Sequence, residues 1–495
     1  MATKTGIDYK EVTKHNTRDS CWVIIHNQVY DVTDFLDSHP GGANVILRNS
    51  GGDATAEYDP IHPPGTIEET LSSSQILGPV DPSTIPAGAA PTTSTSQPAS
   101  EQVTLPPLFT QINLHDFEKT AQKVLSPKGW AYYSSAADDE YTRIHNNAIF
   151  RSMLLRPRIF RDVKDIDLST TLLGIPSRLP LFIAPTAMAR LAHPTGECGI
   201  AEAAGKRGII QCISNNASMR PEQVSAARVS PDQPLWWQLY TQTDRSKSEA
   251  QLARISAPDS GYKAVVWTLD APTPGKRESD ERIANAVAAK SATSGHGVDN
   301  GAPKKAQGLA KELFAGTSAD LTWTDLEWLR KHTHLPIILK GIQTHEDALL
   351  ACSPRCLALG VKAIILSNHG GRAADTSPPA LLTLLEINKY TPEVLQKLEV
   401  YIDGGIRRGT DIVKAVALGA RAVGIGRPAL FGLSGYGPAG VERVIEILED
   451  ELATAVRLLG ENKIADIGRR HVNVSRLMQE MYVEEQDERR LKAKL

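Results

Sequence analysis

Residues 363–372 read AIILSNHGGR, a short apolar run that ends in a histidine, two glycines and an arginine. Other apolar runs of similar length also end in residue types suited to catalysis or phosphate binding. They are LPLFIAPTA (179–187), IIQCIS (209–214), LWWQLY (235–240), AVVWTLD (264–270), PIILKG (336–341), VYIDGG (400–405) and AVGIGR (422–427). Helix-like segments alternate with these runs, and this alternation predicts an α/β fold, a (β/α)8 TIM barrel. Nearly all-hydrophobic runs also fit parallel strands that are buried on both faces.

The ends of these runs define the expected active site, because the carboxyl ends of the strands meet at one mouth of such a barrel. His369 is a base that titrates near neutral pH, and Arg372 carries a planar fork that matches a carboxylate. A base beside a carboxylate clamp indicates attack on the carbon next to a carboxylate. Asp270 is placed to hold the imidazolium once it has taken the proton. Each residue alone fits a simple loop position, but their joint occurrence favours catalysis.

Glycine-containing motifs end the last two strands and predict a phosphate site, which is where this fold usually has one. Glycine amides and arginine side chains would supply the hydrogen-bond donors. The motif residues are Asp403, Gly404, Gly405, Arg407, Gly426 and Arg427. Lys340 ends the fifth strand between apolar neighbours, where a cation would stabilise negative charge on a reduced, electron-accepting ring. One phosphate site without a GxGxxG motif favours a mononucleotide over a dinucleotide.

The first 80 residues contain a different kind of site. The string HPGG begins at His39, and a second histidine, His62, follows in DPIHPP. Two neutral imidazoles on opposite sides of an iron leave no open position for oxygen or substrate, so such an iron only passes electrons. A turn with proline and glycine would explain HPGG by itself. The preceding string CWVIIHNQVYDVTDFLDS predicts two strands before a helix start, a small α+β fold, and this context favours the iron site.

These residues carry two resemblances to known families. Residues 5–80 resemble a cytochrome b5 domain, which implies that His39 and His62 are the axial ligands of haem b. His15 and His26 match no ligand position and are expected at the surface or beside the ligands. The barrel resembles the FMN-dependent α-hydroxy-acid oxidoreductases, including the strings AYYSSAADDEYT and APTAM. The order of the two domains is similar to that of proteins of the flavocytochrome b2 type.

The second resemblance implies roles for individual residues. His369 corresponds to the catalytic base and Asp270 to its orienting partner. The residues that correspond to binders of the substrate carboxylate or hydroxyl are Arg277, Arg372, Tyr132 and Tyr240. Lys340 corresponds to the residue beside the N1–O2 edge of the flavin. Contacts to the flavin ring are implied for Ala184, Pro185, Thr186, Ser214, Gln238 and Thr268, and contacts to the ribityl chain and phosphate for the motif residues above.

Two positions depart from the family pattern. The motif after Arg372 usually continues Gln-Leu-Asp, whereas this chain has Ala373, Ala374 and Asp375, which changes packing behind the carboxylate clamp. After the second strand the family often has an aromatic residue or leucine that bounds the substrate pocket, and alignment places Asn216 there. A polar wall weakens the case for any one small apolar substrate.

The implied reaction is oxidation of an L-2-hydroxy acid, with L-lactate to pyruvate as the first candidate. FMN takes two electrons, and haem b passes them singly to an external carrier such as the basic protein cytochrome c. An oxidase that uses oxygen is one alternative, and a non-catalytic haem carrier fused to an inert barrel is another. The intact set of catalytic residues argues against an inert barrel. Whether hydride leaves directly or the proton leaves first stays open, because both routes use the same base.

Composition divides the chain into four parts. They are a haem-binding domain (1–80), a Pro/Ser/Thr/Ala-rich linker (81–107), the barrel (108–475) and a charged tail (476–495). The tail is expected to fray or to lie on a neighbouring subunit, since the family resemblance implies a homotetramer. The Gly-rich segment 286–308 is predicted to be a mobile loop near the mouth. Five cysteines without a CxxC pair do not form a disulfide framework.

Charge and hydropathy restrict the partners further. Residues 1–80 carry five basic and eleven acidic side chains, a net charge of −6, while the whole chain carries only −3. Such a domain favours a basic partner protein over nucleic acid, although it would also fit a solvated acidic face. No apolar stretch approaches the ~18 residues of a membrane span. The N-terminal residues contain no import signal, which favours the cytoplasm, whereas the family resemblance favours the mitochondrial intermembrane space.

Overall fold

Eight parallel strands close into a barrel, and each strand pairs with its neighbours in chain order. The computed structural model describes residues 6–39, 42–86, 104–293, 298–299, 302–303 and 308–484. The barrel strands are β8 (Leu181–Ile183), β9 (Ile210–Ile213), β10 (Leu235–Leu239), β11 (Tyr262–Thr268), β14 (Ile337–Ile342), β15 (Val361–Leu366), β16 (Glu399–Asp403) and β17 (Ala422–Ile425). Pairing of β17 with β8 closes the ring. The predicted barrel fold is confirmed.

Alternating side chains along these strands fill two layers. Phe182, Trp236 and Tyr401 point inward and pack with ring centroids 5.4 to 5.8 Å apart. Their neighbours in sequence, such as Ile183 and Trp237, belong to the layer between strands and helices. Because both faces are buried, the strands appear in the sequence as unbroken apolar runs. The hairpin of β6 (Thr170–Leu172) and β7 (Ile175–Ser177) packs Leu172 against the inner layer.

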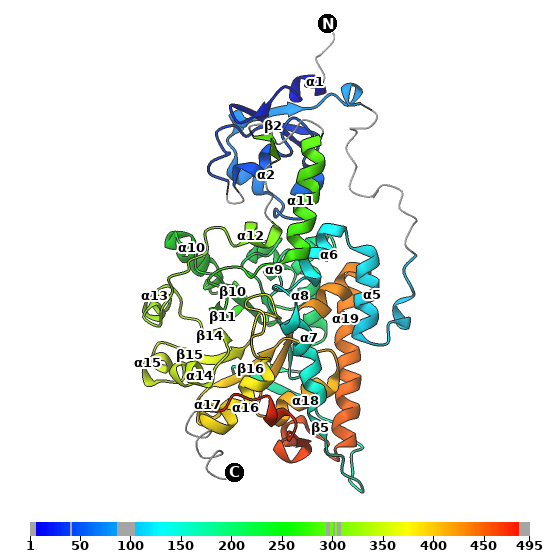
Figure 1. Ribbon diagram of the computed structural model, residues 1–495, viewed down its shortest axis with the longest axis vertical. Helices are drawn as coiled ribbons and strands as arrows, with labels where there is room; N and C mark the ends of the chain where they lie inside the picture. The colour runs from blue at the N-terminus through cyan, green and yellow to red at the C-terminus, as the bar shows by residue number, and fades with distance from the viewer. Residues whose placement is uncertain are drawn as a thin grey trace.

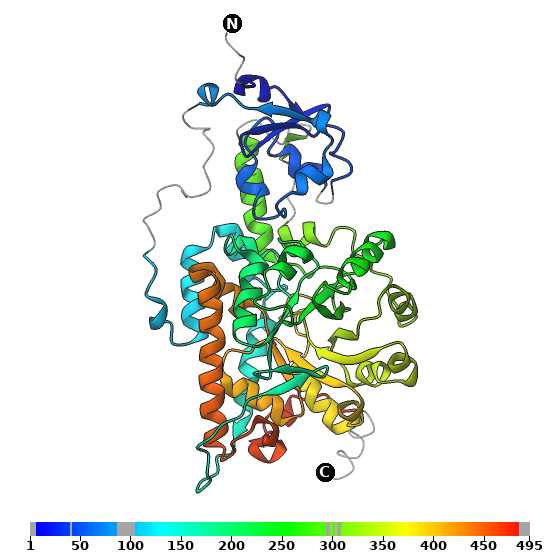
Figure 2. The same cartoon turned by 180° about the vertical axis from the view of Figure 1, so that it is seen from behind.

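Helices surround the barrel (Figures 1 and 2). Those after the strands are α8 (Gly196–Lys206), α9 (Pro221–Ala226), α10 (Arg245–Ile255), α13 (Asp325–His332), α14 (His345–Ala351), α15 (Pro354–Ala358), α16 (Ala380–Tyr390), α17 (Val394–Lys397), α18 (Gly409–Ala417) and α19 (Arg427–Leu458). Before the barrel come α5 (Leu114–Val124), α6 (Pro127–Ser134) and α7 (Tyr141–Ala148). The strand pair β5 (Leu154–Leu155) and β18 (Val472–Asn473) joins this entry segment to the chain's last part.

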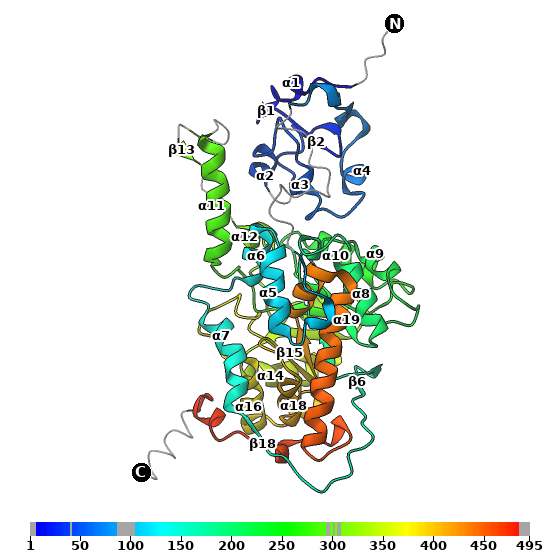
Figure 3. The same cartoon turned by 90° about the vertical axis from the view of Figure 1, so that its right-hand side faces the viewer.

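The small domain is an antiparallel sheet covered by short helices. Its strands are β1 (Asn16–Thr17), β2 (Ser20–Ile25), β3 (Gln28–Asp31) and β4 (Ile76–Pro79), and its helices are α1 (Tyr9–Val12), α2 (Ala43–Leu47), α3 (Thr55–Tyr58) and α4 (Thr66–Thr70). Alternation along β2 sends Val23 and Ile25 to one cluster and Ile24 to another on the opposite face. This domain sits on the end of the barrel from which α11 rises (Figures 1 and 3).

The segment predicted as a mobile loop is partly helical. Helix α11 spans Glu278–Thr293 and includes the first residues of the predicted loop. The Ala-rich string AVAAK supports the helix, because alanine has the highest helix propensity. Strands β12 (Val298–Asp299) and β13 (Ala302–Pro303) pair, and α12 (Leu309–Leu313) follows; residues 294–297, 300–301 and 304–307 lie outside the described residues.

Folded structure continues past both sequence-based boundaries. In the small domain Thr84 Oγ1 accepts a 2.9 Å hydrogen bond from Tyr9 N, so packing reaches into the predicted linker, of which residues 87–103 are not described. In the predicted tail Leu477 and Met481 are buried, and Glu484 Oε1 lies 3.0 Å from His345 Nε2. Residues 485–495, for which fraying was predicted, are not described. Within the described ranges no helix is both long and apolar enough to cross a membrane.

Candidate active site and haem site

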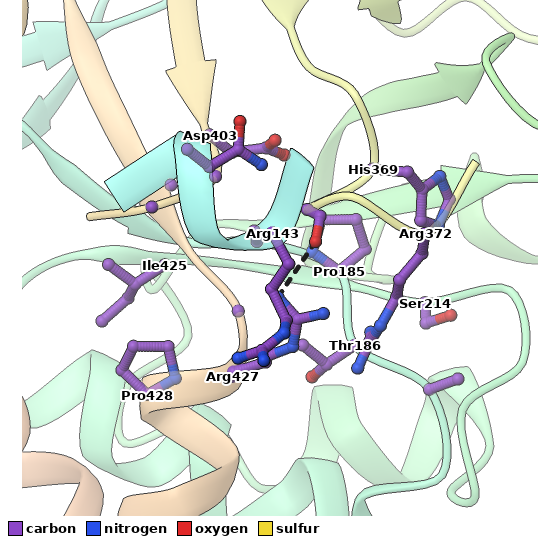
Figure 4. A pocket seen from close by; sticks show the side chains of 18 of the residues that line it. Arg143, Pro185, Thr186, Ser214, His369, Arg372, Asp403, Ile425, Arg427 and Pro428 are labelled. Atoms are coloured by element: carbon purple, nitrogen blue, oxygen red, sulfur yellow. Dashed lines mark hydrogen bonds between the residues drawn. The ribbon is translucent and has the colours of Figure 1, made fainter. Parts of the chain in front are cut away.

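A cavity of about 270 Å³ opens at the carboxyl ends of the barrel strands. Figure 4 shows arginines converging on its centre, with His369 and Asp403 at its edges. The predicted residues that line it are Tyr132, Ala184, Pro185, Thr186, Ser214, Gln238, Tyr240, Thr268, Arg277, Lys340, His369, Arg372, Asp403, Gly404, Gly405, Arg407, Gly426 and Arg427. Asp270 is fully buried directly behind His369. The strand-end pattern therefore led to residues that the fold brings together.

His369 is held by contacts on both ring nitrogens. Its Nδ1 lies 2.9 Å from Asp270 Oδ1, and its Nε2 lies 3.1 Å from the Tyr240 hydroxyl. A carboxylate only accepts, so Nδ1 carries the hydrogen and Nε2 keeps its lone pair on the cavity side. The backbone of His369 has φ +61°, a left-handed conformation at the turn after β15. Its amide donates a 3.0 Å hydrogen bond to Ser367 Oγ, which supports this turn.

Burial and charge set the protonation states of this pair. Burial lowers the pKa of His369 below its usual 6.5, and the negative charge of Asp270 opposes that shift only in part. Burial alone would raise the pKa of Asp270, but the charges of Lys340 and His369 outweigh it and lower that pKa. At neutral pH the pair is thus a neutral imidazole beside a carboxylate, which is the form in which a base accepts a proton.

Lys340 connects the His369–Asp270 pair to Asp403 through its charge. Its Nζ donates to Ser367 Oγ at 3.0 Å and lies 3.7 Å from Asp403 Oδ2 and 3.8 Å from Asp270 Oδ2. Burial alone would lower the pKa of Lys340, but the two carboxylates raise it, so the ammonium stays charged. Ser367 in turn donates to Asp403 Oδ1 at 2.6 Å. This network keeps a positive charge at the strand ends, where a flavin ring would lie.

Two arginines, Arg277 and Arg372, line another part of the cavity. Arg277 is only 4% exposed, and its guanidinium carbon lies 5.7 Å from the ring centre of Tyr132. Its Nε and Nη1 have no hydrogen-bond partner among the described residues. Arg372 donates to the carbonyl oxygens of Tyr133 and Ser135, which fixes its guanidinium at the cavity wall. Burial, and then the charge of Arg277, lower the pKa of Arg372 to about 10. A buried pair of cations favours an anionic ligand between them.

A second group of cations and glycines adjoins Arg372 in the cavity. Arg427 donates to the carbonyls of Tyr133, Gly370 and Ser135 at 3.0 to 3.1 Å, and burial lowers its pKa well below the usual range. Gly405 has φ +82°, and a Cβ there would lie 2.0 Å from Asn146 O. Sequence reasoning missed Arg143 on α7, which lies beside Arg427 in Figure 4. It follows no barrel strand, so only the fold reveals it.

These observations test whether FMN fits. Gln238 Nε2 and Thr268 Oγ1 are buried without a partner in the described part of the chain, as are the two Arg277 nitrogens, and all three residues line the cavity. Buried polar groups normally have partners, so such atoms mark a place for a polar ligand. Clustered arginines at one end and Lys340 beside the strand ends match a phosphate and an electron-accepting ring. The residues present fit FMN.

His39 and His62, the two predicted haem ligands, face each other in the small domain. The ring centroids of His39 and His62 are 6.0 Å apart. An iron between the rings, bonded at about 2 Å to the nearer nitrogen of each, would fit a gap of this size between the centroids. Each Nδ1 contacts a backbone carbonyl, Gly42 O at 3.2 Å and Tyr58 O at 3.1 Å, which leaves both Nε2 atoms available. Burial lowers the pKa of both rings, so both are neutral, the form that binds iron.

Haem fits this pair better than a bare metal ion. In the described ranges no three or more His, Cys, Asp or Glu side chains form a group that would hold an ion. Two opposed imidazoles therefore suit an iron whose remaining positions are filled by a porphyrin. Together, the barrel and the small domain define a class: a flavin-dependent oxidoreductase fused to a two-histidine haem module.

Comparison with known proteins agrees with this class. Residues 121–474 match the family described as FMN-dependent dehydrogenase, and residues 8–81 match the cytochrome b5-like heme/steroid binding domain. The chain belongs to the FMN-dependent dehydrogenase family and carries an N-terminal cytochrome b5-like domain. FMN and haem b are accordingly its cofactors, as predicted.

Two relatives match this chain over more than nine tenths of its length. L-lactate dehydrogenase (cytochrome) of Wickerhamomyces anomalus is 40% identical over 92% of this chain and 78% of its own length. The protein of the same name from Saccharomyces cerevisiae is 39% identical over 94% of this chain and 79% of its own length. Among solved structures, a flavocytochrome b2 variant with pyruvate bound superimposes with a TM-score of 0.66 at 37% identity, covering 77% of this chain and 90% of that one.

Proposed function

We propose that this protein oxidises L-lactate to pyruvate on FMN and passes the electrons singly through haem b to a basic carrier of the cytochrome c kind. The observation that carries the proposal is the contact of His369 with Asp270 on one ring nitrogen and Tyr240 on the other. The relatives with both domains are named L-lactate dehydrogenase (cytochrome). FMN supplies a two-electron acceptor, and the haem iron passes one electron at a time.

Each site residue has a proposed task in this reaction. His369 Nε2 takes the substrate proton, and Asp270 stabilises the imidazolium that results. Arg277 and Arg372 bind the substrate carboxylate between them. The hydroxyl of Tyr240 lies next to His369 and orients the substrate hydroxyl, while Tyr132 lies beside Arg277 at the carboxylate end. The remaining cavity residues hold FMN, with Lys340 beside its ring and the arginine cluster around its phosphate.

Asn216 supports a small substrate despite its polar side chain. Its Nδ2 donates to Leu313 O at 3.2 Å, and its Oδ1 accepts from Asn215 Nδ2 at 3.3 Å. The amide is thus used within the protein, and it holds the end of α12 against the cavity. Leu313 and Phe314 line the cavity beside it, and the Phe314 ring lies 5.1 Å from that of Tyr240. This wall leaves the substrate's side chain in apolar surroundings.

A screen of L-lactate, glycolate, L-mandelate and longer 2-hydroxy acids by kcat/KM tests the substrate. We expect L-lactate to be preferred, and we expect Asn216→Ala to shift the preference toward larger acids because the wall opens. A preference above about tenfold, or ~1.4 kcal/mol, of the wild-type protein for an aromatic acid would overturn lactate and leave the reaction class intact.

The second candidate is an oxidase that returns electrons to oxygen. L-lactate oxidase of Nostoc is 41% identical over 72% of this chain and 96% of its own length. The small domain of this chain has the opposed histidines that an electron carrier needs, which favours the dehydrogenase. Parallel measurement of oxygen uptake and cytochrome c reduction during lactate turnover decides, because faster oxygen uptake would support the oxidase. A homotetramer in solution is also proposed, and light scattering tests it.

A further inference from the structure

The segment from Asp59 to His62 in the small domain contacts the barrel through hydrogen bonds and an apolar side chain. Ile61 packs against the barrel's hydrophobic core. Arg190 Nη1 donates to Asp59 O and, at 3.0 Å, to His62 O. One nitrogen of the barrel therefore holds both ends of a four-residue segment that includes a haem ligand.

Arg190 projects from a rigid base. Its backbone amide donates to Ser218 Oγ at 2.9 Å, and Ser218 Oγ donates to Glu197 Oε2 at 2.8 Å. The preceding amide, Ala189 N, donates to Glu197 Oε1 at 2.9 Å. Glu197 is 1% exposed, so a buried carboxylate ties the loop after β8 to the loop after β9. Because the loop is already rigid, binding through Arg190 does not carry the cost of ordering the backbone.

The same loop lines the flavin cavity. Thr186 and Ala187 are cavity residues, and Arg190 follows Ala187 by three positions. A short, rigid stretch of chain thus joins the wall of the FMN site to the backbone of His62. Electron transfer slows steeply with separation, so a contact that fixes this segment over the cavity bears directly on the rate between the two cofactors.

Other contacts between the domains are ion pairs that do not touch the backbone of His62. Lys128 Nζ is 2.5 Å from Glu57 Oε2, Arg220 pairs with Glu69, and Arg48 Nη1 is 4.0 Å from Glu312 Oε1. Glu57 and Glu69 are 54% and 66% exposed, and ion pairs of that kind contribute little. They provide matched controls for the Arg190 contact.

We propose that Arg190 is a positioning residue that seats the haem-ligand segment on the barrel for electron transfer from FMN to haem. This inference rests on the proposed function. In the step concerned, one electron leaves the reduced flavin and the haem iron goes from ferric to ferrous. Arg190 takes no part in the chemistry of lactate, because it lies outside the cavity's lining and contacts none of the proposed catalytic residues.

Stopped-flow mixing of the oxidised full-length protein with L-lactate separates the two steps by flavin bleaching and by the reduced haem band. Charge-assisted hydrogen bonds are the strong ones, so Arg190→Met should slow haem reduction by about tenfold or more. Flavin reduction and the oxidised haem spectrum should stay as in the wild type. Arg190→Lys should retain most of the rate, since an ammonium also has donors for two carbonyls. Arg220→Met should have little effect.

Hydrogen exchange on the resting protein gives a readout without turnover. The amides of Ile61 and His62 both donate to Tyr58 O, and we expect them to exchange faster in Arg190→Met but not in Arg220→Met. The assignment would be overturned if Arg190→Met reduced its haem at a rate within about twofold of wild type. It would also be overturned if Arg220→Met slowed haem reduction as much as Arg190→Met does. Equal slowing of flavin reduction would overturn it too, since Arg190 would then act on the barrel itself. If L-lactate did not reduce the haem of the wild-type protein, both this assignment and the proposed function would be overturned.

Discussion

At the scale of single residues, the proposed chemistry depends on how the protein controls the charge of His369. Burial favours the neutral ring, and Asp270 limits the shift while fixing the hydrogen on Nδ1. Lys340 places a cation on the other side of Asp270, 3.8 Å from its Oδ2. His369 would therefore accept a proton in a site where the Asp270 carboxylate is already in place to stabilise the positive charge of the imidazolium.

The pH dependence of kcat/KM should follow from these shifts. The base works only when neutral, so activity falls as the pH drops through the pKa of His369. Since burial lowers that pKa, the acid limb should have its midpoint below 6.5. In Asp270→Asn the opposing charge is lost, and the midpoint should move lower still while kcat falls. A wild-type midpoint above 6.5 would contradict this account of the site.

Replacing the base is the sharper test. His369→Gln keeps a polar side chain but cannot take the proton, so kcat should fall by several decades, at about 1.4 kcal/mol for each. FMN should still bind, because the phosphate cluster and the ring contacts are untouched; flavin absorbance after gel filtration checks this. Activity within tenfold of wild type would exclude His369 from the proton transfer.

At the scale of elements, the turns after the barrel strands place the site. The turn after β16 contains Gly404 and Gly405, both with positive φ, and it passes against α7 at Asn146. Asn146 and Asn368 exchange two side-chain hydrogen bonds, at 2.8 and 2.7 Å, so α7 also supports the turn that carries His369. Helix α7 thus braces two turns on either side of the proposed phosphate region.

Gly405→Ala should abolish FMN binding. The left-handed conformation costs an alanine about 1–2 kcal/mol, and the new Cβ would also lie 2.0 Å from Asn146 O. Gly174→Ala is the matched control, since Gly174 has φ +77° with nothing within 4 Å of its added Cβ. Thermal unfolding and flavin content should show a small stability loss in the control and loss of flavin only in Gly405→Ala. Normal flavin content in Gly405→Ala would refute the close fit of this turn.

The sequence predicts elements best where one physical cause dominates. Strands buried on both faces leave apolar runs, and the residue after each run falls at the mouth, which is why His369, Lys340 and Asp403 were found. Arg143 was missed because its helix reaches the cavity only through the tertiary fold. The start of the segment 286–308 is helical where the sequence predicts a loop. Its small residues suit loops and helices alike, and the high helix propensity of alanine favours α11.

At the scale of the whole molecule, the charge of the small domain should choose the electron acceptor. With a net charge of −6 on residues 1–80, the domain should attract a basic carrier through long-range forces. Salt screens such forces, with a screening length of ~8 Å at physiological ionic strength. Lactate-driven reduction of cytochrome c should therefore slow as salt rises, while reduction of a small dye that reacts at the flavin should not.

Removing the small domain provides the control for that prediction. A chain that lacks residues 1–104 should still reduce the dye but should lose cytochrome c reduction. If the shortened chain reduces cytochrome c as fast as the full chain, the haem is not the route to the acceptor. If salt slowed dye reduction as much as cytochrome c reduction, the electrostatic effect would instead act on the barrel.

The contacts between the domains have a consequence for the order of the two electron transfers. Because the two domains belong to one chain, the small domain meets the barrel at an effective concentration on the order of millimolar. At that concentration a few contacts around Arg190 and Ile61 are enough to keep the domain docked for much of the time. Single hydrogen bonds and exposed ion pairs contribute little each, so we expect the small domain to separate from the barrel within one catalytic cycle and to pass its electron to an external carrier. Strengthening the contact, for example with a disulfide, should speed the first transfer and slow the second.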